Sequence, residues 1–329
     1  GLNFDNTTIS NNGSFTATVN SNLTLATDTA LGNLSTTVTA GNTLTLTADQ
    51  ASGKTIAGDG SVTITSATPT TQYDFANINM GTGIATLKTT GSATMLDTAA
   101  YQNFAANTAV NGTDETITIS GHGFTNGQRI QYNKNGGTDI NNLTSGDTYY
   151  VLSATTNTFK VAATSGGSAI NIAAGGAEVH QFRLLGTDLT GIEAITTSGT
   201  DTLTLTATQA DAKTLTTSGS SDSMVINVAT GNDLSGAGLN TSVPVRYSLA
   251  IADGASASMT HDQYNGASSI TGAAGTETIT FTDATGAART FDAGDVTTAT
   301  DILTDTSHGF ITGDAVMYTI PDSGTALAN

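Results

Sequence analysis

Two segments of the chain, about 160 residues apart, repeat one layout. NTLTLTADQASGKTIAGDGSVTIT (42–65) and DTLTLTATQADAKTLTTSGSSDSMVIN (201–227) each contain an alternating strand, an Ala-X-Gln-Ala piece, a Lys-Thr pair, a turn and a second strand. Gln50 and Gln209 mark the same point in the two copies, 209 − 50 = 159 residues apart. An internal repeat of this kind favours an elongated array in which each unit packs mainly on its neighbours.

Two fainter copies follow the clear ones. They are SATMLDTAAYQNF (92–104) and SASMTHDQYNGASSITGAAGTETITF (256–281), in which Gln102 and Gln263 take the glutamine position. Neighbouring glutamines are 102 − 50 = 52 and 263 − 209 = 54 residues apart. This spacing indicates the duplication of a two-copy unit. An aspartate followed by an apolar residue lies upstream of three copies: Asp74-Phe75, Asp188-Leu189 and Asp233-Leu234.

A stretch of different character separates the two pairs. Within 107–186, the strings GQRIQY, TYYVLS and TFKVAA alternate apolar and polar residues between Gly- and Asn-rich turns, which predicts a compact β-module. Its GHGFTNGQRIQYN (121–133) returns as SHGFITGDAVMYT (307–319), shortly before the sequence ends. We therefore expect a second module of this kind that continues in a longer protein or is completed by a neighbouring subunit. His122 and His308 precede Gly-Phe in both copies, where a turn-stabilising or packing role is expected.

The expected fold is all-β, an elongated array of β-sandwich or β-solenoid-like repeats with an inserted small β-module. Thr, Val and Ile in alternating runs suit pleated strands, and 37 glycines supply turns. Helical turns are expected only in the glutamine-centred pieces ADQASG, DTAAYQNF and ATQADAK. The predicted divisions are a strand segment (1–20), a repeat pair (21–106), the inserted module (107–186), a second repeat pair (187–283) and an incomplete second module (284–329).

Charge and composition exclude several classes of function. Nine Lys and Arg against 27 Asp and Glu give a net charge of −18, which argues against nucleic acid and anionic membrane surfaces as partners. The absence of Cys excludes disulfides and thiol chemistry, and no apolar run is long enough for a membrane-spanning helix. The four histidines lack metal-ligand spacing and no catalytic motif accompanies them, so we expect no enzyme activity. The acidity fits a secreted protein in calcium-containing medium, or it serves only solubility.

Calcium is the candidate cofactor. GAAGTETIT (272–280) follows most of the nonapeptide of calcium-binding β-rolls, with Glu277 in the aspartate position. Asp114 and Asp201 lie in shorter Gly-Thr-Asp fragments, and Asp233 lies in ATGNDLSGAGLN (229–240). These motifs are isolated rather than tandem, and Gly-Thr-Asp is also an ordinary turn before a strand. Both interpretations of the four carboxylates remain open from the sequence.

Tyr132, Tyr149 and Tyr150 belong to the densest aromatic group of the chain, in the predicted module. On alternating strands such residues usually form the core. The alternative is an exposed patch that contacts a glycan or receptor.

The repeat LTLTADQASGKTIAGDGSVTIT with its partner at 203–226, together with the HGF module, resembles bacterial β-strand-repeat surface proteins: S-layer proteins, RTX-type adhesins and extracellular filaments. The module also resembles modules of phage tail fibres. The resemblance implies secretion to the cell surface, a lattice, fibre or stalk role, and calcium dependence. We expect a structural protein that polymerises with copies of itself by strand-edge pairing, for which residues 1–20 are a candidate donor strand. The alternative is an adhesin or tail-fibre segment that binds a glycan or receptor through 107–186.

Overall fold

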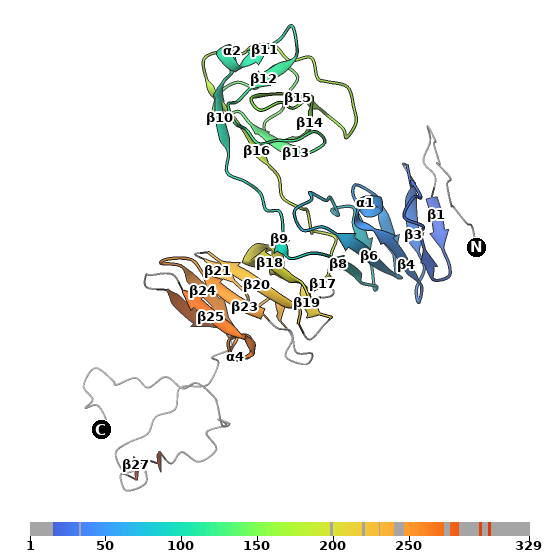
Figure 1. The fold of residues 1–329 in the computed structure, drawn as a ribbon, viewed down its shortest axis with the longest axis vertical. Coiled ribbons are helices and arrows are strands. Elements are labelled where there is room, and N and C mark those ends of the chain that lie inside the picture. The colour runs from blue at the N-terminus through green and yellow to red at the C-terminus, as the bar shows by residue number, and fades with distance from the viewer. Residues whose placement is uncertain are drawn as a thin grey trace.

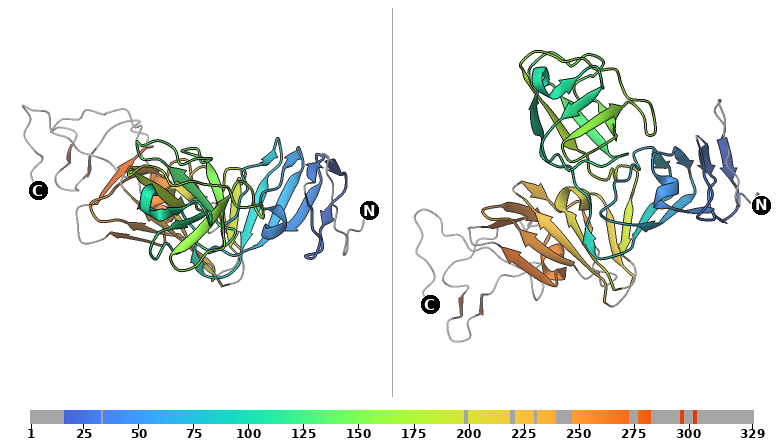
Figure 2. Two further views of the ribbon diagram at one scale, coloured as in Figure 1. Left: turned by 90° about the horizontal axis from the view of Figure 1, so that it is seen from above. Right: turned by 45° about the horizontal axis from the view of Figure 1, so that its top comes forward.

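The chain forms a β-solenoid of stacked parallel strands, from whose side an antiparallel β-module projects (Figures 1 and 2). This architecture comes from a computed structural model. The structure describes residues 16–32, 34–197, 200–218, 221–229, 231–239, 247–272 and 277–282, and the backbone of 296–297 and 302–303. The prediction of an all-β, solenoid-like array with an inserted module is confirmed.

The solenoid strands form four sheets in which neighbouring strands run parallel. The first sheet contains β1 (Thr16–Val19), β3 (Ser35–Val38), β5 (Ile56–Gly58) and β7 (Ile78–Met80), in that order. The second contains β2 (Leu23–Thr24), β4 (Thr43–Thr47), β6 (Ser61–Ala67), β8 (Ala85–Thr89), β17 (Ala194–Thr197), β19 (Thr214–Thr217) and β22 (Gly238–Leu239). The third runs β25 (Ser269–Gly272), β23 (Tyr247–Ile251), β20 (Ser223–Val228), β18 (Thr202–Thr206) and β9 (Ala93–Thr94). The fourth contains β21 (Asn232–Asp233), β24 (Ser256–Met259) and β26 (Thr278–Phe281).

Alternation along each strand builds the interior. In the second sheet, the parallel register stacks buried aliphatic side chains directly on one another in a column formed by Leu46, Ile64, Leu87, Ile195, Leu215 and Leu239. Each strand presents only a few apolar residues to the interior, so the column is stable only when neighbouring coils cover it. The strand pair β8–β17 continues this column although the two strands lie more than 100 residues apart in the sequence.

The intervening positions carry the threonines that dominate the composition. Thr45, Thr63 and Thr86 follow one another on the outer face of β4, β6 and β8. On the following coils, the hydroxyls of Thr196 and Thr216 lie 2.7 Å apart and form a hydrogen bond. Threonine suits these positions because its β-branch favours extended backbone and its hydroxyl links adjacent coils.

Successive repeats do not stack sheet on sheet. The similar strands β4 and β18 lie in the second and third sheets, so the later repeat is displaced by one sheet. The displacement occurs after β9 and after β24. There the chain returns to the preceding sheet, so that β17 pairs with β8 and β25 pairs with β23. Between β24 and β25 the chain makes only the short helix α4 (His261–Gly266). At the corresponding point, between β9 and β17, it inserts the whole module.

The module is an antiparallel sheet with its own core. Its strands are ordered β10 (Gln102–Ala105), β16 (Val179–Leu184), β13 (Arg129–Asn133), β14 (Thr148–Leu152), β15 (Thr158–Ala162), β12 (Thr116–Thr118) and β11 (Val110–Asn111). The strands predicted from GQRIQY, TYYVLS and TFKVAA are present as β13, β14 and β15. A separate core explains how so large an insertion leaves the solenoid ladder intact.

The boundary before the module differs from the predicted one. Gln102 opens strand β10, which pairs with β16, instead of ending a solenoid repeat. The module therefore begins before residue 107. The segment DTAAYQNF (97–104) does not form the predicted helical turn, because its aromatic residues pack in the module. Phe104 is buried against Phe182, and the Tyr101 hydroxyl donates to Gln131.

The other predicted helical turns are present as α1 (Ala48–Ala51) and α3 (Ala207–Ala210). Helix α4 and the single turn α2 (Ala106–Ala109) were not predicted. Most of the candidate donor strand (residues 1–15) and nearly all of 284–329, including His308, lie outside the described residues. Strand β1 pairs with β3 in parallel at the edge of the first sheet.

Candidate functional site

The glutamine that marks each repeat is a hydrogen-bonded tie between coils. In helix α3, the Gln209 backbone N–H donates to the hydroxyl of Thr206, and the Thr206 N–H donates to Gln209 Oε1. The remaining Nε2 group donates to the carbonyl of Leu96, in the preceding coil, at 3.1 Å. Gln50 and Gln263 form the same capping box and donate to two carbonyls each. The buried amide thus satisfies both the helix terminus and the neighbouring loop.

The Asp-apolar pairs form corners of the solenoid, and the corner at Leu234 accepts the hydrogen bond from Gln263. Asp74, Asp188 and Asp233 each accept a hydrogen bond from the backbone N–H two residues later. The apolar partners Phe75, Leu189 and Leu234 are buried. An aspartate in an Asx turn bends the backbone while the next side chain anchors it in the core. These aspartates therefore have a structural role that the sequence spacing alone located but did not explain.

The module is held on the solenoid by a joint around Arg129, the first residue of β13. Its guanidinium Nη1 lies 2.8 Å from the carboxylate of Asp74, and Nη2 donates to the carbonyl of Tyr73. Gln72 joins from the same loop: its side chain accepts from Arg129 N–H and donates to the carbonyls of Arg129 and Leu185. The Arg129 side chain is only 10% exposed, so this ion pair is largely shielded from water.

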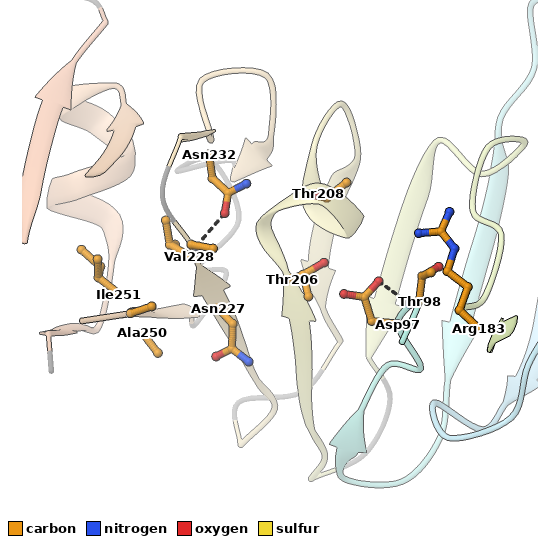
Figure 3. A pocket seen from close by; sticks show the side chains of 12 residues that line it. Asp97, Thr98, Arg183, Thr206, Thr208, Asn227, Val228, Asn232, Ala250 and Ile251 are labelled. Carbon is orange, nitrogen blue, oxygen red and sulfur yellow. Dashed lines mark hydrogen bonds between the residues drawn. The ribbon is translucent and has the colours of Figure 1, made fainter. Parts of the chain in front are cut away.

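A groove of about 600 Å³ lies where the module meets the solenoid (Figure 3). Its floor is formed by the carboxyl ends of β18, β20 and β23, with apolar contributions from Val228 and Ile251. One wall is the segment that leads into the module, at Asp97 and Thr98. Arg183 of β16 lies next to Thr98 and also lines the groove. This volume falls within the range of about 300–1,000 Å³ that is typical of ligand sites.

The groove presents hydrogen-bonding groups that are not used elsewhere. Asn227 and Thr208 are exposed, and neither side chain has a hydrogen-bond partner among the described residues. Arg183 is fixed in place: Nε and Nη2 donate to Gln131 Oε1, and its guanidinium carbon lies 4.5 Å from the centre of the Tyr101 ring. Within the part of the chain that the structure describes, no carboxylate lies within ion-pair distance of Arg183. The geometry leaves a pre-oriented cation at one end of a groove whose lining is both apolar and polar.

The structure places the four candidate calcium ligands in four separate turns. Asp114 is exposed in the β11–β12 hairpin and accepts from the side chain of Asn111. Asp201 accepts from the N–H of Gly91 and so links the β17–β18 turn to the β8–β9 turn. At the Asp233 corner, the hydrogen bond from Ser235 holds the pKa of the carboxyl below its usual value. Glu277 directly precedes β26, in the position that Asp201 takes before β18.

These carboxylates are not brought together. Among the described residues, no group of three or more His, Asp or Glu side chains is arranged to hold a metal ion. Asp201 and Asp233 are instead engaged by backbone N–H groups, as ordinary turn aspartates are.

The candidate aromatic contacts lie mostly in the module core. Tyr132 is fully buried; its hydroxyl accepts from the Ile140 N–H and lies 2.7 Å from Nδ1 of His180. Tyr149 is also buried, and its hydroxyl accepts from the Thr144 N–H. Tyr150 alone is partly exposed. Burial of the first two favours packing, the more usual role of aromatic residues on alternating strands.

Two histidines support that core. His122 Nδ1 accepts from the N–H of Phe124, so it stabilises the bend as predicted, and its ring packs on Phe159. His180 is 1% exposed. Burial lowers the pKa of His180, because the surroundings disfavour the charged imidazolium. The Tyr132 hydroxyl and His180 Nδ1 share a hydrogen bond whose direction depends on the tautomer of the neutral imidazole.

Comparison with protein-family models, curated proteins and solved structures finds no match. Within the described part of the chain, no helix has the length and apolarity needed to cross a bilayer. Proposals about function therefore depend on the geometry of the chain itself.

Proposed function

We propose that the chain is an extracellular structural protein of a bacterial surface, which polymerises with copies of itself into a filament, sheath or S-layer. In this proposal its role is mechanical rather than enzymatic. The solenoid is the load-carrying axis, and the module is a lateral decoration. The observation that carries the proposal is the strand pair β8–β17. Through this pair, the parallel ladder and its aliphatic column remain continuous although the module is inserted between the two strands in the sequence.

The ends of the solenoid support assembly by strand addition. Strands β1 and β2 each lie at an edge of the first and second sheets, and β25 and β26 each lie at an edge of the third and fourth sheets, at the opposite end of the solenoid (Figure 1). Because coils already stack through parallel register and a continuous apolar column, a second copy can extend the array with the same interactions. The experiment is electron microscopy of the purified chain, compared with a variant lacking residues 1–20. We expect regular filaments or a lattice from the complete chain, and folded monomers from the variant. Polymers of unchanged appearance from the variant would refute the role of this segment.

We include calcium in this proposal as a stabilising ion, since the chain carries a net charge of −18. Divalent cations between subunits reduce the repulsion of acidic surfaces. Thermal melting with and without EDTA tests this: a lower melting temperature or loss of polymers in EDTA is expected. An unchanged melting curve and unchanged polymers would remove calcium from the proposal.

A second candidate function is an adhesin or tail-fibre segment that binds a glycan or receptor. The groove beside Arg183 favours it, because this site is formed jointly by the module and the solenoid. A glycan array probed with the complete chain distinguishes the two functions. A purely structural protein binds nothing on the array, whereas an adhesin binds a defined set of saccharides.

A further inference from the structure

The groove at the junction of module and solenoid combines the guanidinium of Arg183 with the carboxylate of Asp97 and with neutral hydrogen-bonding groups. Arg183 lies at one end, and Thr208, Asn227 and Asn232 lie along the groove from α3, β20 and β21 (Figure 3). Among the described residues, Arg183 is not within ion-pair distance of any carboxylate, whereas Arg129 is paired with Asp74. A ligand that brings its own carboxylate would complete this site.

The remaining donors and acceptors indicate the rest of the ligand. Asn227 offers both an amide donor and an acceptor, and the Asp97 carboxylate, which accepts from Thr98 N–H, can accept further hydroxyl protons. The Thr206 hydroxyl oxygen accepts from Gln209 N–H, which leaves its own hydrogen free to donate. Mixed donors and acceptors along an open groove match the hydroxyl groups of a saccharide.

An acidic peptide fits this site less well. Asp97 in the same groove repels a dense row of carboxylates, while a saccharide carries its charges further apart. The strands that form the floor, β18, β20 and β23, are already paired with one another. They therefore offer no free strand edge to an extended peptide.

We propose that this groove binds an acidic saccharide of the hexuronate class, with a ring carboxylate held by Arg183 and ring hydroxyls held by Asp97, Asn227 and Thr206. The inference rests on the adhesin function proposed above. Arg183 is suited to the planar carboxylate because the contacts with Gln131 and Tyr101 fix its guanidinium before the ligand arrives.

Isothermal titration calorimetry of the complete chain tests the proposal at physiological ionic strength. The probes are oligogalacturonide and alginate oligosaccharides, the carboxyl-reduced neutral form of each, and a polyglutamate peptide. We expect binding of at least one uronate oligosaccharide, and at least about tenfold weaker binding of its neutral form. Binding of neither uronate, equal binding of the neutral form, or stronger binding of polyglutamate would each overturn the proposal.

Variants at position 208 locate the site with little risk to folding. Thr208 is exposed at the second residue of α3, where Glu and Gln are both tolerated and Glu is favoured by the helix terminus. Thr208→Glu should weaken uronate binding about tenfold, whereas Thr208→Gln should retain most of it. Arg183→Gln should abolish the preference for the charged oligosaccharide, and Lys160→Gln, outside this groove, should not. Unchanged affinity in Thr208→Glu would place the binding elsewhere and overturn this site.

The outcomes separate this inference from the functions on which it depends. Neutral saccharides that bind on the array would leave the adhesin function standing while refuting the acidic ligand. Polymers in electron micrographs of the same preparation report on the structural function independently of any saccharide.

Discussion

Gln209 Nε2 donates a hydrogen bond to the carbonyl oxygen of Leu96, 113 residues earlier in the sequence, at 3.1 Å. Leu96 is the last residue before the chain leaves for the module, and Gln209 lies in the first complete coil after its return. The equivalent amides of Gln50 and Gln263 reach back only 21 to 29 residues. The glutamine side chain therefore forms the same hydrogen-bonded link between neighbouring coils, whether or not the module is inserted between them.

Gln209→Glu should destabilise the solenoid by about 1–3 kcal/mol at neutral pH. Glutamate keeps an oxygen that accepts from Thr206 N–H, so the capping box survives. The ionised carboxylate cannot donate to Leu96, and it places a negative charge beside a carbonyl oxygen. Chemical denaturation followed by circular dichroism measures the loss. Gln181→Glu is the matched control, because Gln181 makes only an exposed hydrogen bond to Asn103. Equal stability of the two variants would contradict the role given to Gln209.

Arg129→Met should loosen the module without unfolding it. The substitution removes the cationic partner of Asp74 and one hydrogen-bond donor from each of the carbonyls of Tyr73 and Gly186, at a cost of about 2–4 kcal/mol in the joint. We expect faster proteolysis in the linking segments and separate unfolding transitions for module and solenoid.

Lys134→Met provides the comparison for that variant. The Lys134–Asp139 pair is 3.6 Å long and more exposed, so its loss should change stability by less than about 0.5 kcal/mol. If Arg129→Met has the same proteolysis rate and the same cooperativity of unfolding as the wild type, the joint depends on contacts other than those of Arg129.

Replacing residues 96–193 by the segment 260–268 should give a continuous solenoid. Those nine residues join β24 to β25 in the corresponding place, and the β8–β17 register is already the same as that of an uninterrupted ladder. We expect retained β-sheet circular dichroism and cooperative unfolding, with the lateral mass lost from the small-angle scattering profile. An unfolded or aggregated product would show that the module is needed to align β8 with β17.

The sequence revealed the repeat, the strand periodicity and the presence of the module, because these are local patterns. It did not reveal that Gln102 belongs to the module, since its spacing from Gln50 matches that of Gln263 from Gln209. A tertiary contact places Gln102 in the module, because Phe104, two residues later, packs on Phe182 of β16. The shift of each repeat by one sheet was equally hidden, because the register between distant strands leaves no mark in either strand alone.

For the candidate sites as well, features encoded by adjacent residues could be predicted, and features formed by tertiary contacts could not. Asp233 could be found as a turn aspartate, since Asx turns are encoded by adjacent residues. The groove residues Asp97, Arg183 and Asn227 come from three separate segments of the chain and share no motif. The signal that was available was the concentration of cations in the module: four of the nine Lys and Arg residues are Arg129, Lys134, Lys160 and Arg183.

The buried His180 should make the stability of the module depend on pH. Burial lowers the pKa of His180 below its ordinary value near 6.5, although the charges of Glu178 and Asp139 oppose the shift. The stabilising effect of the neutral ring is therefore complete above the unfolded pKa, and it is lost as the pH falls through the lower folded value. His180→Phe should reduce this part of the pH dependence. At neutral pH it should cost about 1–2 kcal/mol, because the buried Tyr132 hydroxyl loses its hydrogen bond to the imidazole. NMR titration of His180 and near-ultraviolet circular dichroism of both proteins between pH 4 and 8 measure the effect; a His180 pKa at or above 6.5 would contradict it.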